Sequence, residues 1–110
     1  MKTLKKGHYA ELMAAAILTR NEFDVFHPLQ GHGPIDLIAV KGDQVMLLDV
    51  KVDQHTQRRG RSKPTRIHRT RKPHQKMLGV RLAYLNINAQ QLHITDHNAD
   101  CQDAQPLVLT

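Results

Sequence analysis

The stretch from Pro34 to Lys51 constrains the fold of this chain more than any other. Two runs rich in aliphatic residues, 34–40 and 44–51, flank the short glycine-containing connection 41–43. This pattern is typical of a β-hairpin. Both runs are apolar at alternate and intervening positions alike, which favours strands covered on both faces. The sequence therefore predicts that the hairpin lies at the centre of a sheet.

Three charged residues interrupt this apolar hairpin: Asp36, Asp49 and Lys51. A buried charge costs several kcal/mol unless it is paired or holds a metal. Asp49 and Lys51 are two positions apart, so in a strand they point to the same face. One interpretation is an ion pair where the strand emerges into water. The other is a site for a hard cation, because magnesium takes one or two carboxylates and a neighbouring lysine can orient water or stabilise a phosphate.

The second interpretation makes a prediction about the register of the hairpin. In an unbulged hairpin the residue numbers of opposite positions have a constant sum, and opposite residues share a face. Asp36 lies opposite Asp49 when that sum is 85, which pairs Val40 with Val45 and leaves residues 41–44 as the connection. A shift by one residue would turn the two carboxylates to opposite faces. We therefore expect an odd sum, or a bulge that restores the same facing, with Asp36, Asp49 and Lys51 converging beside Glu11 of the N-terminal helix.

These residues resemble the signature of the PD-(D/E)XK nuclease superfamily. The resemblance rests on Pro34-Ile35-Asp36, on Asp49-Val50-Lys51 after the hairpin, and on a preceding helical segment, Gly7-His8-Tyr9-Ala10-Glu11. The order of the acidic residues is similar to that in archaeal-type Holliday junction resolvases and in a bacterial family of small predicted endonucleases. The resemblance covers residues 7 to 54. The chain departs from the commonest pattern in having one residue between Pro34 and Asp36, and aspartate at position 49.

The resemblance implies a restriction endonuclease-like fold and endonucleolytic hydrolysis of phosphodiesters in duplex or branched DNA. Asp36, Asp49 and the backbone carbonyl of Val50 would hold Mg²⁺, for which Mn²⁺ could substitute. Glu11 would bind a second ion directly or through water, and Lys51 would orient the attacking water. His32, Gln54 and Gln75 are the candidate accessory residues.

Positive charge is concentrated in one stretch of the chain. The net charge is +6, and the rest of the chain is close to balance. Charge confined in this way indicates an anionic partner, for which DNA is the first candidate. The alternative is a solvated surface loop. The predicted DNA-binding residues are Arg58, Arg59, Arg61, Lys63, Arg66, Arg69, Arg71 and Lys72.

The rest of the chain predicts an α/β domain with a mixed central sheet of four or five strands flanked by helices. The N-terminal helix is expected on one face and the second helix on the other. Residues 1–6 are expected to form a frayed arm, and residues 53–72 a basic loop. The helices are expected at 8–21 and 73–78, and the further strands at 24–28, 80–87 and 91–95. Residues 107–109 are expected to form either a last edge strand or a free end.

Length and composition narrow the class of protein. The 110 residues are expected to form a single domain, residues 1–110. No apolar run is long enough to cross a membrane, and the N-terminus lacks the pattern of a secretory signal. The lone Cys101 predicts a reducing compartment, the cytoplasm. A zinc site at His93, His97 and Cys101 is weakly supported, because a fourth ligand is missing.

Three functions remain open from the sequence. The expectation is a magnesium-dependent endonuclease acting as a homodimer, with one site for each strand. The first alternative is a nucleic-acid-binding module of the same fold without catalysis. The second is an interaction protein whose basic loop binds an acidic partner.

Overall fold

The computed structural model describes residues 3–53, 55–56, 65–66, 70–96 and 107–110. In these residues the helices are α1 (Thr3–Arg20) and α2 (Pro73–Leu78). The strands are β1 (Asp24–Phe26), β2 (Leu37–Lys41), β3 (Gln44–Val52), β4 (His55–Thr56), β5 (Thr65–Arg66), β6 (Arg81–Asn86), β7 (Gln91–Ile94) and β8 (Leu107–Leu109). No described helix is long and apolar enough to span a membrane.

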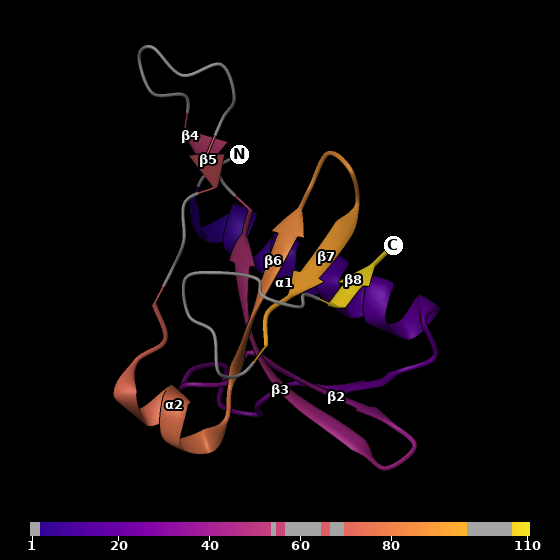
Figure 1. The fold of residues 1–110 in the computed structure, drawn as a ribbon, viewed down its shortest axis with the longest axis vertical. Helices are drawn as coiled ribbons and strands as arrows, with labels where there is room; N and C mark the ends of the chain where they lie inside the picture. Colours follow the sequence, from indigo (N-terminus) through magenta and orange to yellow (C-terminus); the bar gives the residue numbers. More distant parts are fainter. Residues whose placement is uncertain (1–2, 54, 57–64, 67–69, 97–106) are drawn as a thin grey trace.

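Six of these strands form one mixed sheet in the order β1-β2-β3-β6-β7-β8 (Figure 1). The neighbours β3 and β6 run parallel, and every other neighbouring pair in the sheet is antiparallel. The predicted hairpin therefore lies at the centre, as expected. The sheet is larger than the four or five strands expected, because residues 107–109 form β8, which adds a sixth strand at one edge.

The hairpin has the register that places Asp36 opposite Asp49. Leu37 pairs with Leu48 and Val40 with Val45, so the constant sum is 85 and this prediction is confirmed. The expected four-residue connection is wrong, because Lys41 also pairs with Gln44. The turn that remains has Gly42 at its first position with φ +61°. A left-handed glycine there is typical of the tight two-residue turns that suit twisted hairpins.

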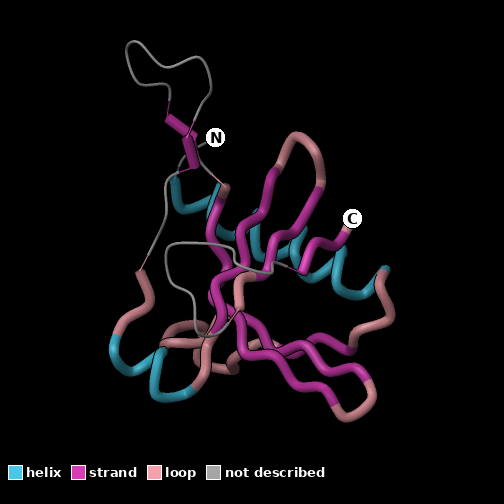
Figure 2. Tube along the Cα trace, viewed as in Figure 1, coloured by secondary structure: helices cyan, strands magenta, loops and turns pink. Residues whose placement is uncertain are grey.

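Helix α1 packs across one face of the sheet (Figure 2). Its buried face includes Ala10, Ala14, Ile17 and Leu18, at the spacings that put side chains on one side of a helix. The small alanines let the helix approach the strands closely. The helix begins at Thr3, so the expectation of a frayed arm is wrong for residues 3–6. Residues 3–6 thus form the first turn of α1 and not a separate arm.

Helix α2 has the predicted bounds. Pro73 opens it, and Gly79 closes it with φ +73°, the left-handed conformation that ends many helices. Its predicted position is wrong: Figure 1 shows α2 beside the beginning of β6 and not over the second face of the sheet. A helix of six residues is too short to cover that face. The expected basic loop is also interrupted, because β4 and β5 pair as a separate two-stranded sheet.

Candidate active site

Asp36 is fixed against β3 by two hydrogen bonds. Its backbone N–H donates at 2.8 Å to the carbonyl of Leu48, the residue that Leu37 pairs with, so the regular ladder ends at Leu37 and Asp36 lies just before β2. Its Oδ2 accepts the backbone N–H of Val50, also at 2.8 Å. Asp36 and Asp49 are also within side-chain hydrogen-bonding reach of each other. The register therefore brings together two carboxylates that lie far apart in the sequence.

This arrangement raises the pKa of Asp36 from 3.8 to about 7. Burial makes the largest contribution, and the side-chain hydrogen bond with Asp49 adds to it. The Val50 N–H lowers the pKa, while the negative charges of Asp49 and Glu11 raise it. Near neutral pH the Asp36 carboxyl therefore readily holds a proton. A divalent cation in the same place would remove the need for that proton.

Asp49 is held from two sides and is only 8% exposed. Its Oδ2 accepts Nε2 of Gln75 at 2.8 Å, and its Oδ1 lies 3.6 Å from Nζ of Lys51. Gln75 is itself fixed, because Nε2 also donates to the carbonyl of Pro34 at 3.0 Å and Oε1 accepts the N–H of Lys72 at 2.8 Å. Helix α2 therefore contributes a positioning residue to the carboxylate pair. The side chain of Lys51 is 41% exposed, so its ammonium remains open to solvent.

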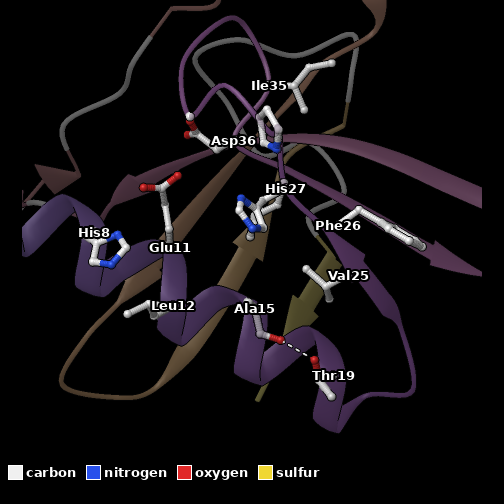
Figure 3. Close-up of a pocket in the computed structure, with 13 residues that line it drawn as sticks. His8, Glu11, Leu12, Ala15, Thr19, Val25, Phe26, His27, Ile35 and Asp36 are labelled. Atoms are coloured by element: carbon white, nitrogen blue, oxygen red, sulfur yellow. Dashed lines mark hydrogen bonds between the residues drawn. The ribbon is translucent and has the colours of Figure 1, made fainter.

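The carboxylate of Glu11, on α1, points toward Asp36 (Figure 3). The half-buried Glu11 and Asp36 both line a cleft, and the Glu11 charge acts on Asp36. Within the described ranges, however, no three His, Cys, Asp or Glu side chains form a cluster that could hold a metal ion. Glu11 therefore stands apart from the two aspartates, as a second carboxylate position and not as a third ligand of one cluster.

The oxygen donors present fit a hard cation. In a β-strand the N–H and C=O of one residue point to the same edge. The N–H of Val50 bonds to Asp36, so the Val50 carbonyl lies on the edge of β3 that faces Asp36. Two carboxylates and a backbone carbonyl are donors that Mg²⁺ prefers over nitrogen or sulfur. These donors thus fit the Mg²⁺ ion that the resemblance predicts.

The cleft itself has a volume of about 560 Å³. It lies between α1 on one side and β1 with the loop before Asp36 on the other (Figure 3). The residues that line it are His8, Glu11, Leu12, Ala15, Thr19, Val25, Phe26, His27, Pro28, Gly31, Ile35, Asp36 and Leu37. The cleft thus places a groove that is partly open to solvent beside the candidate carboxylates Glu11 and Asp36.

Two histidines in this lining were missed from the sequence. His8 lies three residues before Glu11, a spacing that puts both on one helix face and could have revealed it. His27 follows β1, and no sequence signal marks its position. The predicted accessory residue His32 is exposed and is not among the lining residues.

The structure places the predicted DNA-binding residues in different environments. Arg71 is a correction: it is buried, and its Nη1 donates to the carbonyl of Val80 at 3.1 Å, so it supports the fold and does not face a ligand. Lys72 is exposed at the start of α2. Arg66 lies in β5. The calls that lie outside the described residues are Gln54, Arg58, Arg59, Arg61, Lys63, Arg69, His97 and Cys101.

Comparison with known proteins finds a similarity of fold. No protein-family model matches this chain, and no curated protein sequence matches it. Among solved structures, the bacterial homing endonuclease I-Ssp6803I matches with a TM-score of 0.61 and 14% identity, over 100% of this chain and 79% of the other. The two proteins share an α/β fold. At this identity the comparison establishes the fold alone.

The pKa of Asp36 predicts how stability depends on pH without metal. The folded-state value lies above the unfolded value of 3.8, so the destabilisation appears as pH rises from about 4 and is complete above about 7. Asparagine mimics the protonated side chain and avoids this cost. In chelator, Asp36→Asn should match the parent in Tm at pH 4 and exceed it by roughly 4 °C or more at pH 8. Differential scanning fluorimetry measures this difference.

Asp43→Asn, in the exposed turn of the hairpin, is the matched control and should show no such pH-dependent gap. An equal Tm difference between parent and Asp36→Asn at pH 4 and pH 8 would contradict the raised pKa.

Proposed function

We propose that this protein is a magnesium-dependent endodeoxyribonuclease of the PD-(D/E)XK type with a restriction endonuclease-like arrangement. The observation that carries the proposal is the convergence of Asp36, Asp49 and Lys51 at one point of the central hairpin. The shared fold with a homing endonuclease supports it. A structural ion pair alone would explain Lys51 and Asp49 but not a second, half-buried carboxylate beside them.

The proposed ligands of Mg²⁺ are Asp36, Asp49 and the carbonyl of Val50, with Glu11 holding a second ion directly or through water. Bound there, Mg²⁺ or Mn²⁺ would supply the positive charge that stabilises a phosphate undergoing attack. Gln75 keeps the Asp49 carboxylate in one orientation through its 2.8 Å hydrogen bond. The N–H of Val50 does the same for Asp36.

Lys51 is the proposed positioning group for the attacking water. Its ammonium lies 3.6 Å from Asp49 Oδ1 and is partly open to solvent, so it can donate to a water beside the carboxylates. The same charge would stabilise negative charge on the phosphate. Because the lysine and its partner Asp49 stand on one strand face, their relative position is set by the backbone.

DNA is the proposed partner. The basic stretch, residues 58–72, is proposed to contact the phosphate backbone of the DNA. With Arg71 buried, seven cations of the predicted set remain for this role, of which Lys72 is exposed. Phosphate contacts hold the duplex in register without reading its sequence. Two copies of the chain related by a two-fold axis would place one site at each strand.

The salt dependence of DNA affinity measures these contacts. Each phosphate contact contributes about −0.9 to the slope of log affinity against log salt. Changing Arg58, Arg59 and Arg61 together to glutamine should flatten that slope by up to roughly 2 to 3 units. Fluorescence anisotropy with a short duplex in Ca²⁺ gives the slope.

The control for this series is the double change of Arg20 and Lys41 to glutamine. Both side chains already donate to backbone carbonyls, of Thr110 and Asn21, and should leave the slope unaltered. The basic stretch does not contact DNA if the triple variant has the slope of the parent.

A cleavage assay separates this proposal from its alternative, a DNA-binding module without catalysis. The purified protein is incubated with plasmid, linear, flapped and four-way-junction DNA in Mg²⁺, Mn²⁺, Ca²⁺ or chelator. We expect products in Mg²⁺ and Mn²⁺ and none in chelator. Tight binding of every substrate without any product in Mg²⁺ or Mn²⁺ would favour the binding module.

A further inference from the structure

Besides the carboxylates, the described residues that line the cleft include two groups able to give up a proton near neutral pH, the imidazoles of His8 and His27. Glu11 and Asp36 are already the proposed ligands of ions, and the hydroxyl of Thr19 donates to a backbone carbonyl at 2.7 Å. Figure 3 shows the side chain of Glu11 pointing toward Asp36 and that of His8 pointing away from it. The remaining proton donor of the cleft is therefore His27.

The pairing of β1 with β2 explains why His27 faces the cleft. Val25 pairs with Ala39, which is buried beneath α1, so Val25 lies on the face of the sheet that α1 covers. His27 is two positions further along, and alternation brings its side chain to the same face. Figure 3 shows its imidazole pointing toward α1. The side chain is exposed and has no hydrogen bond or ion pair within the described part of the chain, so it is open to a substrate.

Lys51, the proposed positioning group for the attacking water, lies on the other side of the carboxylate pair. Its neighbour Val50 belongs to the core beneath α1, so Lys51 points to the opposite face of the sheet. A backbone N–H lies in the plane of the sheet, so the Asp36 carboxylate that accepts the Val50 N–H lies between the two faces.

This arrangement places the attacking and leaving oxygens on different faces of the sheet. In phosphoryl transfer the two oxygens lie roughly in line, on opposite sides of phosphorus. Water that attacks from the side of Lys51 therefore displaces an oxygen on the side of α1, where His27 lies. An alkoxide is a poor leaving group, and protonation by a positioned imidazole removes that barrier.

We propose that His27 is a general acid that gives a proton to the leaving oxygen. The oxygen of water forms a bond to phosphorus, and the bond from phosphorus to the bridging oxygen of the sugar breaks. The electron pair of the broken bond stays on that oxygen, which takes the proton of the His27 imidazolium and leaves as a hydroxyl group. The proton lost by the attacking water passes to solvent, from which the neutral imidazole regains one. This inference rests on the proposed function, which places the phosphate at Asp36 and the water at Lys51.

The test replaces the leaving oxygen by sulfur. The end groups of the cleavage products identify which bridging oxygen leaves, and a short duplex is made with sulfur at that position. In single-turnover cleavage in Mn²⁺, His27→Ala should cut the normal duplex about 100-fold or more slower than the parent, the usual contribution of a general acid. A thiol is far more acidic than an alcohol, so a sulfur leaving group needs no donated proton. The variant should therefore cut the sulfur duplex within about threefold of the parental rate.

Two further measurements separate proton donation from a structural role. The cleft is partly open to solvent, so imidazole added to the buffer can take the place of the missing side chain and should restore part of the rate of His27→Ala on the normal duplex. Anisotropy in Ca²⁺ should give equal DNA affinities for parent and variant. Gln30→Ala, at an exposed position of the same loop outside the cleft lining, is the matched control and should cut both duplexes at the parental rates.

The two duplexes also separate this inference from the proposed function. A loss in His27→Ala confined to the normal duplex, with unchanged affinity, would support the general acid. An equal loss on both duplexes, or a parental rate on the normal duplex, would overturn it and leave the nuclease standing. A parent that cuts neither duplex in Mg²⁺ or Mn²⁺ would remove the proposed function and the general acid with it.

Discussion

Replacing Asp49 by asparagine should abolish DNA cleavage and leave DNA affinity nearly unchanged. The proposed site loses one of its two charged ligands, and such changes at metal-dependent sites lower rates by about 1000-fold or more. The amide can still accept the hydrogen bond from Gln75, so the local structure should persist. Plasmid nicking in Mg²⁺ measures the rate, and duplex anisotropy in Ca²⁺ measures binding.

The control for this prediction is Asp43→Asn, which removes the same charge at the exposed turn of the hairpin. It should cleave at the parental rate. If Asp49→Asn also retained that rate, Asp49 would not be a metal ligand and the proposed mechanism would fail.

Lys51→Ala should lower the rate of DNA cleavage, with an effect second only to that of Asp49→Asn. Loss of one preorganised donor to a reacting group lowers the rate by about 100- to 1000-fold. The lysine is partly exposed, so its removal should cost little stability. Single-turnover cleavage at saturating protein isolates this effect from binding.

Lys5→Ala, at an exposed position on α1, is the matched control and should retain full activity. Arginine at position 51 tests whether charge alone suffices, since its planar fork places donors differently. Cleavage by Lys51→Ala within a factor of three of the parent would exclude a role in the reaction.

The centre of the fold was predictable because its signals are local. Two continuous apolar runs joined by a glycine turn predict the pairing of β2 with β3, and the need to bring Asp36 beside Asp49 selects the observed register. Pro73 and Gly79 mark both ends of α2 for equally local reasons. These features follow from spacing and turn chemistry, without reference to the rest of the chain.

The features that failed depend on distant parts of the chain. Arg71 looks like its basic neighbours in the sequence, yet the fold buries it against the carbonyl of Val80. Gln75 was expected near the site only through the family resemblance, because no periodicity specifies the position of α2 relative to β3. His27 enters the cleft only because β1 lies beside α1. Burial and contacts across elements are tertiary properties, so a charge or a histidine gives no hint of them.

Manganese bound to crystals of the protein would test the central claim most directly. Anomalous scattering locates Mn²⁺ without reference to activity. We expect a peak between the carboxylates of Asp36 and Asp49, at bonding distance, roughly 2.0–2.6 Å, from their oxygens and from the carbonyl of Val50. The Asp49→Asn variant should lack it. Crystals that cleave DNA when dissolved in Mn²⁺, but hold no manganese at this pair, would contradict the proposed site.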